Sequence, residues 1–102
     1  MVKCILISED STATEIETPL GSDMYTILKG SSTFVGQWTS ENENDDNIII
    51  MQSTNSMLDR NQIILPHPFQ NEVIHGPILI VKMNYMAHPQ DFTLVEWLEL
   101  VG

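Results

Sequence analysis

The sequence predicts one small α+β domain covering residues 1–102, with about five strands in a mixed sheet and two helices packed on that sheet. Two runs, Val2–Ile7 and Ile78–Val81, have apolar residues on both faces, which is typical of central, buried strands. A capped amphipathic pattern over Thr93–Val101 indicates a terminal helix. A chain of 102 residues has the size of one domain and can bury one modest core.

The amino-terminal residues predict a hairpin. Val2–Ile7 is followed by a polar turn and then by Thr12–Thr18, where Glu15 and Glu17 are expected to face solvent. Because Val2–Ile7 is apolar on both faces, we expect it to be a central strand, with Thr12–Thr18 as its outer neighbour.

Asp23–Lys29 predicts a short helix of about two turns, which would cross from the opening hairpin to the next strands. Ser22 is the expected N-cap, and Gly30 stands where a left-handed C-cap residue belongs. A strand through Tyr25–Leu28 is the competing interpretation of the same residues.

A second hairpin is predicted from Thr33–Thr39 and Ile48–Met51. Gly36 interrupts the first of these strands, which indicates a bulge or a close approach of another part of the chain. The connection between them, Ser40–Asn47, is acidic and rich in asparagine, as expected for a solvated loop.

The centre of the chain is Asn61–Tyr85, which contains two apolar runs separated by prolines and a Gly-Pro pair. Pro66 and Pro68 exclude a central strand, so we expect Leu65–Phe69 to form an ordered extended corner. Ile78–Val81 is β-branched and short, and it predicts a strand buried on at least one face.

The terminal helix has the clearest local signal. Thr93 and Glu96 have the spacing of a capping box, in which each side chain binds a backbone N–H of the other. Phe92 before the cap and Trp97 stand at the positions of a hydrophobic staple. The apolar face of this helix consists of Leu94, Trp97, Leu98 and Val101.

The predicted order is therefore β-β-α-β-β-β-α, with a short crossover helix and a C-terminal helix. This order is typical of a β-grasp-like or related small α+β domain. If Val2–Ile7 and Ile78–Val81 pair in parallel, the crossover between them would be right-handed.

Charge limits the partners of this chain. Fourteen acidic residues against four basic ones give a net charge of −10 and a pI near 4.3. That balance argues against nucleic acid and against an anionic membrane, because both are bound mainly through Lys and Arg. It leaves a basic protein partner open, although acidity also simply keeps a small protein soluble.

The sequence favours a soluble protein of the cytoplasm. One cysteine, Cys4, allows no intrachain disulfide, as in proteins of reducing compartments. The apolar residues near the amino terminus are too few for a signal peptide, and no run approaches the roughly 20 residues that span a bilayer.

Neither catalytic residues nor metal ligands can be assigned, so we predict no enzyme and no cofactor. Cys4 lies in an apolar strand, where a thiol stays protonated. His67, His75 and His88 stand in loop contexts without the close spacing of a zinc site. The acidic run at 41–47 lacks the central Gly and terminal Glu of an EF-hand loop.

The remaining candidates for a binding surface are aromatic and proline residues. A rigid proline loop loses little conformational entropy when it binds, so we predict a partner surface. Its residues are Trp38, Pro66, His67, Pro68 and Phe69. The alternative is that Leu65 and Phe69 fill the core, that the prolines only turn the chain, and that Trp38 is buried.

Several segments, taken together, resemble a family of small uncharacterised proteins from algae and large DNA viruses. More loosely, they are similar to short phage-borne proteins of unknown function with the same order of elements. The resemblance implies an algal or viral origin and supplies no active site. Within the corner Leu65–Phe69, the chain departs from the family at His67, where another proline is expected. The segments are Leu28–Gly30, Thr33–Trp38, Ile48–Met51, Asn61 with Leu65–Phe69, Ile74–Met83 and Pro89–Trp97.

Three functions remain open. The first is a small acidic, non-enzymatic protein-interaction or accessory factor, located in the host cytoplasm if the protein is viral. The second is a homo-oligomer that sequesters a small ligand or nucleotide in a pocket lined by Lys29, Arg60 or Lys82. The third is a metal-dependent hydrolase, which requires two of the three histidines to converge in space.

Overall fold

The centre of the molecule is the β-branched strand β5 (Ile78–Met83), whose first four residues are buried. Successive side chains of a strand point to opposite faces, so Ile78 and Ile80 join one buried cluster while Leu79 and Val81 join another. The computed structural model of this chain describes residues 1–21, 23–39, 46–84 and 86–102. Ser22, the expected N-cap, and residues 40–45 of the expected acidic connection lie outside the described residues.

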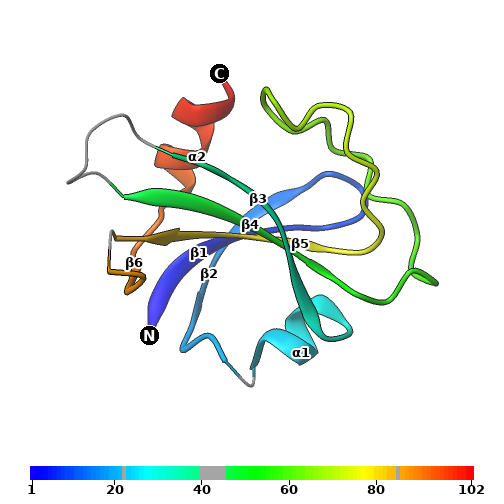
Figure 1. The fold of residues 1–102 in the computed structure, drawn as a ribbon, viewed down its shortest axis with the longest axis horizontal. Helices are drawn as coiled ribbons and strands as arrows, with labels where there is room; N and C mark the ends of the chain where they lie inside the picture. The colour runs from blue at the N-terminus through cyan, green and yellow to red at the C-terminus, as the bar shows by residue number, and fades with distance from the viewer. Residues whose placement is uncertain (22, 40–45, 85) are drawn as a thin grey trace.

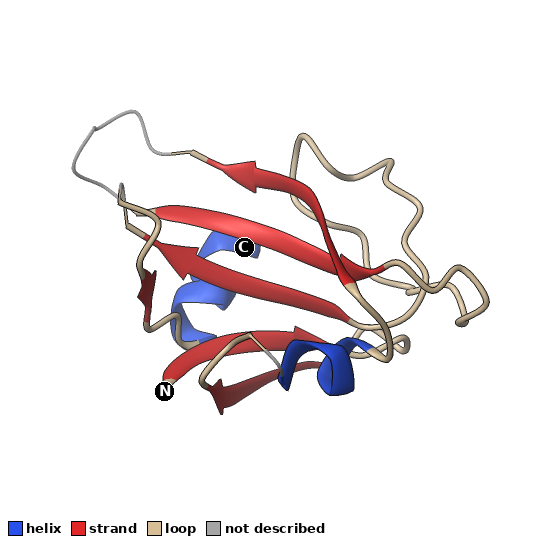
Figure 2. Cartoon of the chain, turned by 60° about the horizontal axis from the view of Figure 1, so that its bottom comes forward, coloured by secondary structure: helices blue, strands red, loops and turns tan. Residues whose placement is uncertain are grey.

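Both predicted hairpins are confirmed, and they flank β5 on its two sides (Figures 1 and 2). On one side β1 (Val2–Ile7) pairs with β5, and β2 (Ala13–Thr18) pairs with β1. On the other side β4 (Asn47–Ser53) pairs with β5, and β3 (Ser32–Trp38) pairs with β4. The order β2-β1-β5-β4-β3 makes β1 a central strand, as its apolar residues predicted.

The α+β class is confirmed, but the prediction of a mixed sheet is wrong: in the described part of the chain every strand pairing is antiparallel. The long segment 54–77 begins and ends at the same end of the sheet, because Gln52 in β4 lies opposite Ile78 in β5. The chain therefore reverses direction between these strands as in a wide hairpin. β1 then pairs with the free side of β5, also antiparallel, so no parallel crossover exists between β1 and β5.

A sixth strand, β6 (Pro89–Gln90), pairs with Lys82 and Met83 of β5 and is absent from the predicted order of elements. It lies where β1 separates from β5, since only Ile5–Ile7 of β1 pair with that strand. The first residues of β1 are instead bound by the chain that follows β6. The Lys3 N–H donates to Asp91 Oδ1 at 2.9 Å, and the Lys3 carbonyl accepts from the Phe92 N–H at 2.8 Å.

Helix α1 (Asp23–Leu28) confirms the short crossover helix over the competing strand. Its end differs from the prediction, because Lys29 and not Gly30 has the left-handed conformation, with φ of 59°. The Gly30 N–H donates to the Tyr25 carbonyl, which completes a Schellman motif with Lys29 at its left-handed position. Gly30 has a different role: it lies close to Ser53, whose Oγ would be 2.5 Å from a Cβ at this position and would have to move.

Helix α2 (Leu94–Val101) has the predicted capping box. The Glu96 N–H donates to Thr93 Oγ1 at 3.2 Å, and the Thr93 N–H donates to Glu96 Oε1 at 3.3 Å. Phe92 and Trp97, the expected staple pair, are both buried in one cluster. No helix in the described residues is long and apolar enough to cross a membrane.

The sheet has two unequally covered faces. On the first face, α2 and the segment 54–77 cover the strands, and on the second face α1 does so; Figure 1 shows these covers above and below the sheet. The buried residues of the first face are Ile5, Ile7, Ile50, Leu65, Ile74, Ile78, Ile80, Phe92 and Trp97. Those of the second face are Cys4, Leu28, Leu79 and Val81.

Candidate functional site

The proline corner, Leu65–Phe69, lies over the first face of the sheet and is buried at both ends but not at its tip. Leu65 is buried in the main core, and Phe69 is half-buried against it. His67 and Pro68 at the tip are exposed. The alternative interpretation therefore holds for Leu65 and Phe69, which fill the core. The tip of the corner remains available for contact.

Contacts with strand β3 hold the tip of the proline corner. The Trp38 indole N–H donates to the His67 carbonyl at 3.0 Å, and the rings of Trp38 and Phe69 meet edge to face with centroids 5.3 Å apart. The Phe69 ring also lies directly on the backbone of Gly36, where a Cβ would come within 2.3 Å of its Cε1 atom. Gly36 thus fulfils both expectations, since the β3–β4 register also shifts between Phe34 and Gly36.

Trp38 also connects the corner to helix α2. Its ring centroid lies 6.2 Å from that of Trp97, so Phe69, Trp38 and Trp97 form one aromatic row. Trp38 is half-buried in this row, and Trp97 is fully buried. The row is therefore mainly a support that fixes the corner and the helix relative to each other.

The predicted partner residues thus separate into supports and exposed groups. Trp38, Pro66 and Phe69 are half-buried, and only His67 and Pro68 are exposed. The His67 ring nitrogen Nδ1 lies 3.1 Å from Gln70 Nε2, the only hydrogen bond of this ring in the described part of the chain. The peptide bond between His67 and Pro68 is cis.

Asn61 anchors the segment that carries the corner. It is only 4% exposed, and its side-chain Nδ2 donates to the carbonyls of Ile7, Ser8 and Gly76 at 3.2, 3.0 and 3.0 Å. Its Oδ1 accepts from the Ile63 N–H at 3.0 Å. One amide thereby joins the end of β1 to both legs of the segment.

Sequence reasoning missed the role of Asn61. The only available signal is local: Asn followed two residues later by a bonded N–H is an Asx turn, which this residue type favours. The three carbonyls that it binds come from positions 15 to 54 residues away in the chain. Such distant acceptors leave no pattern in one sequence.

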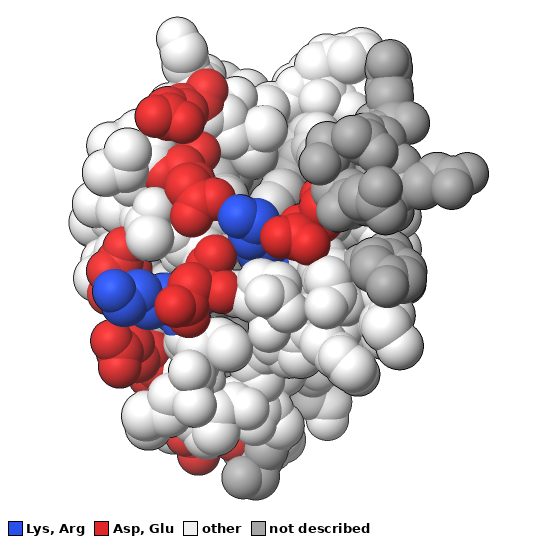
Figure 3. Space-filling view, turned by 90° about the vertical axis from the view of Figure 1, so that its left-hand side faces the viewer, with Lys and Arg blue, Asp and Glu red and all other residues white. Residues whose placement is uncertain are grey.

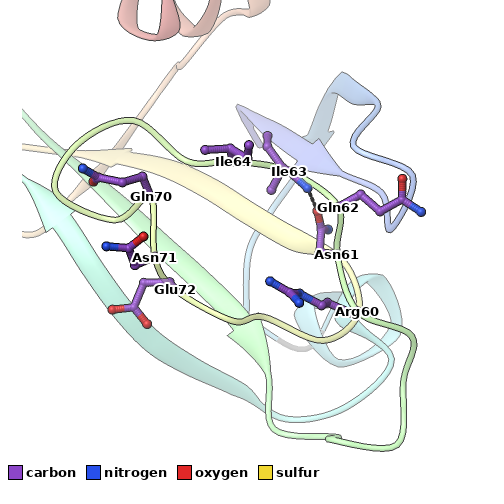
Figure 4. A pocket seen from close by; sticks show the side chains of 8 residues that line it. All are labelled: Arg60, Asn61, Gln62, Ile63, Ile64, Gln70, Asn71 and Glu72. Atoms are coloured by element: carbon purple, nitrogen blue, oxygen red, sulfur yellow. Dashed lines mark hydrogen bonds between the residues drawn. The ribbon is translucent and has the colours of Figure 1, made fainter.

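The two legs of the segment enclose an open pocket of about 580 Å³. Figure 4 shows the Arg60 side chain directed toward the opposite leg, which carries Glu72. In the described residues the Arg60 guanidinium has no hydrogen bond or ion pair. The full lining consists of Arg60, Asn61, Gln62, Ile63, Ile64, Gln70, Asn71 and Glu72.

The three basic residues named as alternatives for lining a ligand pocket lie apart from one another, and one of them, Arg60, lines the pocket described above. Lys29 Nζ lies 3.3 Å from Glu9 Oε1 near helix α1. Lys82 Nζ lies 2.6 Å from Glu96 Oε2 and 3.9 Å from Asp46 Oδ2, on β5 below helix α2. Arg60 alone lines the pocket, so any anion bound there would meet one guanidinium and several amides.

The groups considered for catalysis are likewise dispersed. His75 Nδ1 lies 2.9 Å from the Leu58 carbonyl, while His88 is exposed in the turn before β6. The described residues hold no cluster of three or more His, Cys, Asp or Glu side chains that could bind a metal. Burial raises the pKa of the Cys4 thiol to about 11, so it is protonated at neutral pH.

A family model with the description "Family of unknown function (DUF5880)" matches residues 5–100, nearly the whole chain. No curated protein and no solved structure matches the chain.

Proposed function

We propose that this chain, which belongs to the family of unknown function DUF5880, is a non-enzymatic protein-interaction or accessory factor. The partner is another protein, and it contacts the exposed tip formed by His67 and Pro68. Trp38, Pro66 and Phe69 hold this tip from below. The resemblance to proteins of algae and large DNA viruses supports a more specific role, that of a viral accessory factor in the host cytoplasm.

The observation that supports this proposal most directly is an exposed tip on a fixed support. Trp38 binds the tip carbonyl, and Phe69 is confined between the Trp38 ring and the Gly36 backbone. A loop that is already ordered loses less conformational entropy when a partner binds, so more of the contact energy becomes affinity. Proline at the tip reduces that entropy further.

Charge supports a protein partner over nucleic acid or an anionic membrane. The chain carries a net charge of −10, and two of its four basic side chains, Lys29 and Lys82, are in ion pairs. Nucleic acid and acidic lipids are bound through clusters of Lys and Arg. We assign no cofactor and no catalytic residue, because the protonated Cys4 and the dispersed histidines offer no activated nucleophile.

The proposal is tested by affinity capture from cells that contain the protein, comparing the wild type with a tip variant. His67→Ser removes the exposed imidazole of the tip and leaves Pro68 and the supports of the corner unchanged. We expect at least tenfold less of one captured protein, corresponding to about 1.4 kcal/mol of binding free energy. Met57→Ser, at an exposed residue outside the proline corner, is the matched control and should capture normally.

Gly36→Ala tests the support separately, because the added Cβ displaces the Phe69 ring and changes no exposed residue of the tip. We expect weaker capture than for the wild type even where circular dichroism shows an intact fold. Equal capture by all variants, or a small molecule retained by the purified protein in native mass spectrometry, would contradict the proposal.

The alternative function, a homo-oligomer that sequesters a small ligand or nucleotide, is favoured by the Arg60 pocket alone. Its open volume of about 580 Å³ is in the range of ligand sites, and its one cation is free among the described residues to meet an anion. Thermal-shift measurements with mononucleotides decide it. Stabilisation that disappears in Arg60→Met would favour this function over the first.

A further inference from the structure

Helix α2 has more apolar surface than its packing uses. Trp97 is buried, but Val95, Leu98 and Val101 are 65%, 56% and 43% exposed. These three residues are spaced by three positions, so they form one continuous row along the helix. We call this row the α2 flank. A helix that is apolar beyond its buried face usually contacts something else.

Negative charge surrounds the α2 flank. Glu99 follows Val95 by four positions and is exposed beside it, and Glu15 Oε1 accepts from the Leu94 N–H at 2.9 Å at the start of the helix. The last turn of α2 has no basic residue, so the partial negative charge of the helix end is not offset there.

The basic residues near α2 do not reverse this field. Lys82 is held between Glu96 and Asp46, and Lys3 lies opposite Glu17 in the pairing of β1 and β2. Figure 3 shows acidic side chains gathered in a band across this side of the molecule, with only small patches of Lys or Arg between them. The net effect on a ligand at the α2 flank is therefore attraction of positive charge.

We infer that the α2 flank binds a basic amphipathic segment of another protein, with its apolar side on Val95, Leu98 and Val101. Lys or Arg side chains of that segment would lie near Glu15 and Glu99. A second copy of this chain fits less well, because two molecules of charge −10 repel each other across such a contact. This inference shares with the proposed function only the premise that the partner is a protein, since the surface is different.

The test is a titration of the ¹⁵N-labelled full chain with a synthetic helical peptide of leucine and lysine, followed by NMR. The same peptide with glutamate in place of lysine is the charge control. We expect the lysine peptide to shift amide signals of residues 94–101 and the glutamate peptide to leave them unchanged. Val95→Gln with Leu98→Gln, which keeps good helix formers, should weaken binding about tenfold.

Two further variants make the result specific. Glu15→Gln with Glu99→Gln should weaken binding severalfold and reduce its dependence on salt, and the amide oxygen introduced at position 15 can still accept from the Leu94 N–H. Met57→Ser should change nothing. Equal binding of both peptides, binding of neither, or signal changes confined to residues 60–72 would overturn the inference.

The oligomeric state tests the remaining possible occupant of the α2 flank, a second copy of this chain. If sedimentation shows a wild-type dimer that Leu98→Gln dissociates, the occupant is a second copy and the inference is wrong. Failure of the lysine peptide together with loss of the captured partner in the tip variant would overturn this inference alone. Success of the peptide with unchanged capture in the tip variant would contradict only the proposed use of the proline corner.

Discussion

The two faces of the sheet are made from the same strands but are covered in different ways. Among the described residues, the first face has nine buried apolar side chains under α2 and the segment 54–77. The second face has four, under a helix of six residues. Its other apolar side chains are only partly buried, and they include three of the six methionines, Met24, Met51 and Met83.

This difference shows that one sheet can have one face held by specific contacts and another face whose side chains can repack. The first face is fixed by directional contacts, namely the Asn61 amide, the Trp38 indole and the capping box of α2. The second face relies on flexible side chains that can repack, a property typical of methionine. Both proposed contact surfaces belong to elements that cover the first face.

The largest expected effect compares neighbouring residues of β5 that point to opposite faces. Ile80 and Leu79 are both fully buried. We expect Ile80→Ala to lower the free energy of unfolding by about 4 kcal/mol and Leu79→Ala by about 2.5 kcal/mol, because flexible neighbours can partly close the second cavity. Urea denaturation measures both. Equal losses would mean that the second face is packed as rigidly as the first.

A smaller effect tests the anchor of the first face. Asn61→Ala leaves three carbonyls and the Ile63 N–H without their side-chain partner, which should cost about 2 kcal/mol. Hydrogen exchange should increase across residues 60–76. Asn55→Ala is the control, since Asn55 is exposed and its Oδ1 accepts only the Met57 N–H among the described groups. A loss of the same size at both positions would contradict the anchoring role.

The smallest expected effect concerns pH and the cover formed by α2. The hydrogen bond from Lys82, with further help from the Thr93 N–H, lowers the pKa of Glu96 below its usual value of 4.5. The folded state therefore gains stability above that pH and loses it as the pH falls through the lower folded pKa. Because Glu96 is partly exposed, we expect only a few tenths of a kcal/mol.

Comparing the free energy of unfolding of the wild type with that of Glu96→Gln isolates the contribution of the Glu96 charge from that of the other carboxylates. The wild type should have the higher free energy of unfolding at neutral pH, and this difference should vanish in acid. Met57→Ser, an exposed change that alters no ionisable group, should show no such dependence. A difference that persists unchanged in acid would mean that the Glu96 charge does not contribute.

The elements with local signals were predicted well from the sequence. The capping box of α2 depends on residues three positions apart, and both hairpins join strands that are neighbours in the chain. The direction of β1 relative to β5 was not predictable, because it depends on where the segment 54–77 returns to the sheet. The strand β6 was missed because two residues beginning with Pro89 resemble any loop.

The candidate site was predicted only in part, for a similar reason. The corner itself follows from Pro66 and Pro68, which restrict the backbone locally. Which side chain faces solvent depends on distant neighbours, as when Gly36 provides the space that Phe69 occupies. The position of each basic residue also depends on distant acids, so Lys29, Arg60 and Lys82 could not be separated in advance.

The hydrogen bonds between the Lys3 backbone and the residues after β6 have a consequence for biosynthesis. The backbone groups of Lys3 leave the ribosome well before their partners Asp91 and Phe92, since Asp91 follows 88 residues later in the chain. Until then, the beginning of β1 is an open edge to which another nascent chain can pair. This part of the sheet should therefore close only after Asp91 and Phe92 have been synthesised, and general chaperones would shield that edge in the interval.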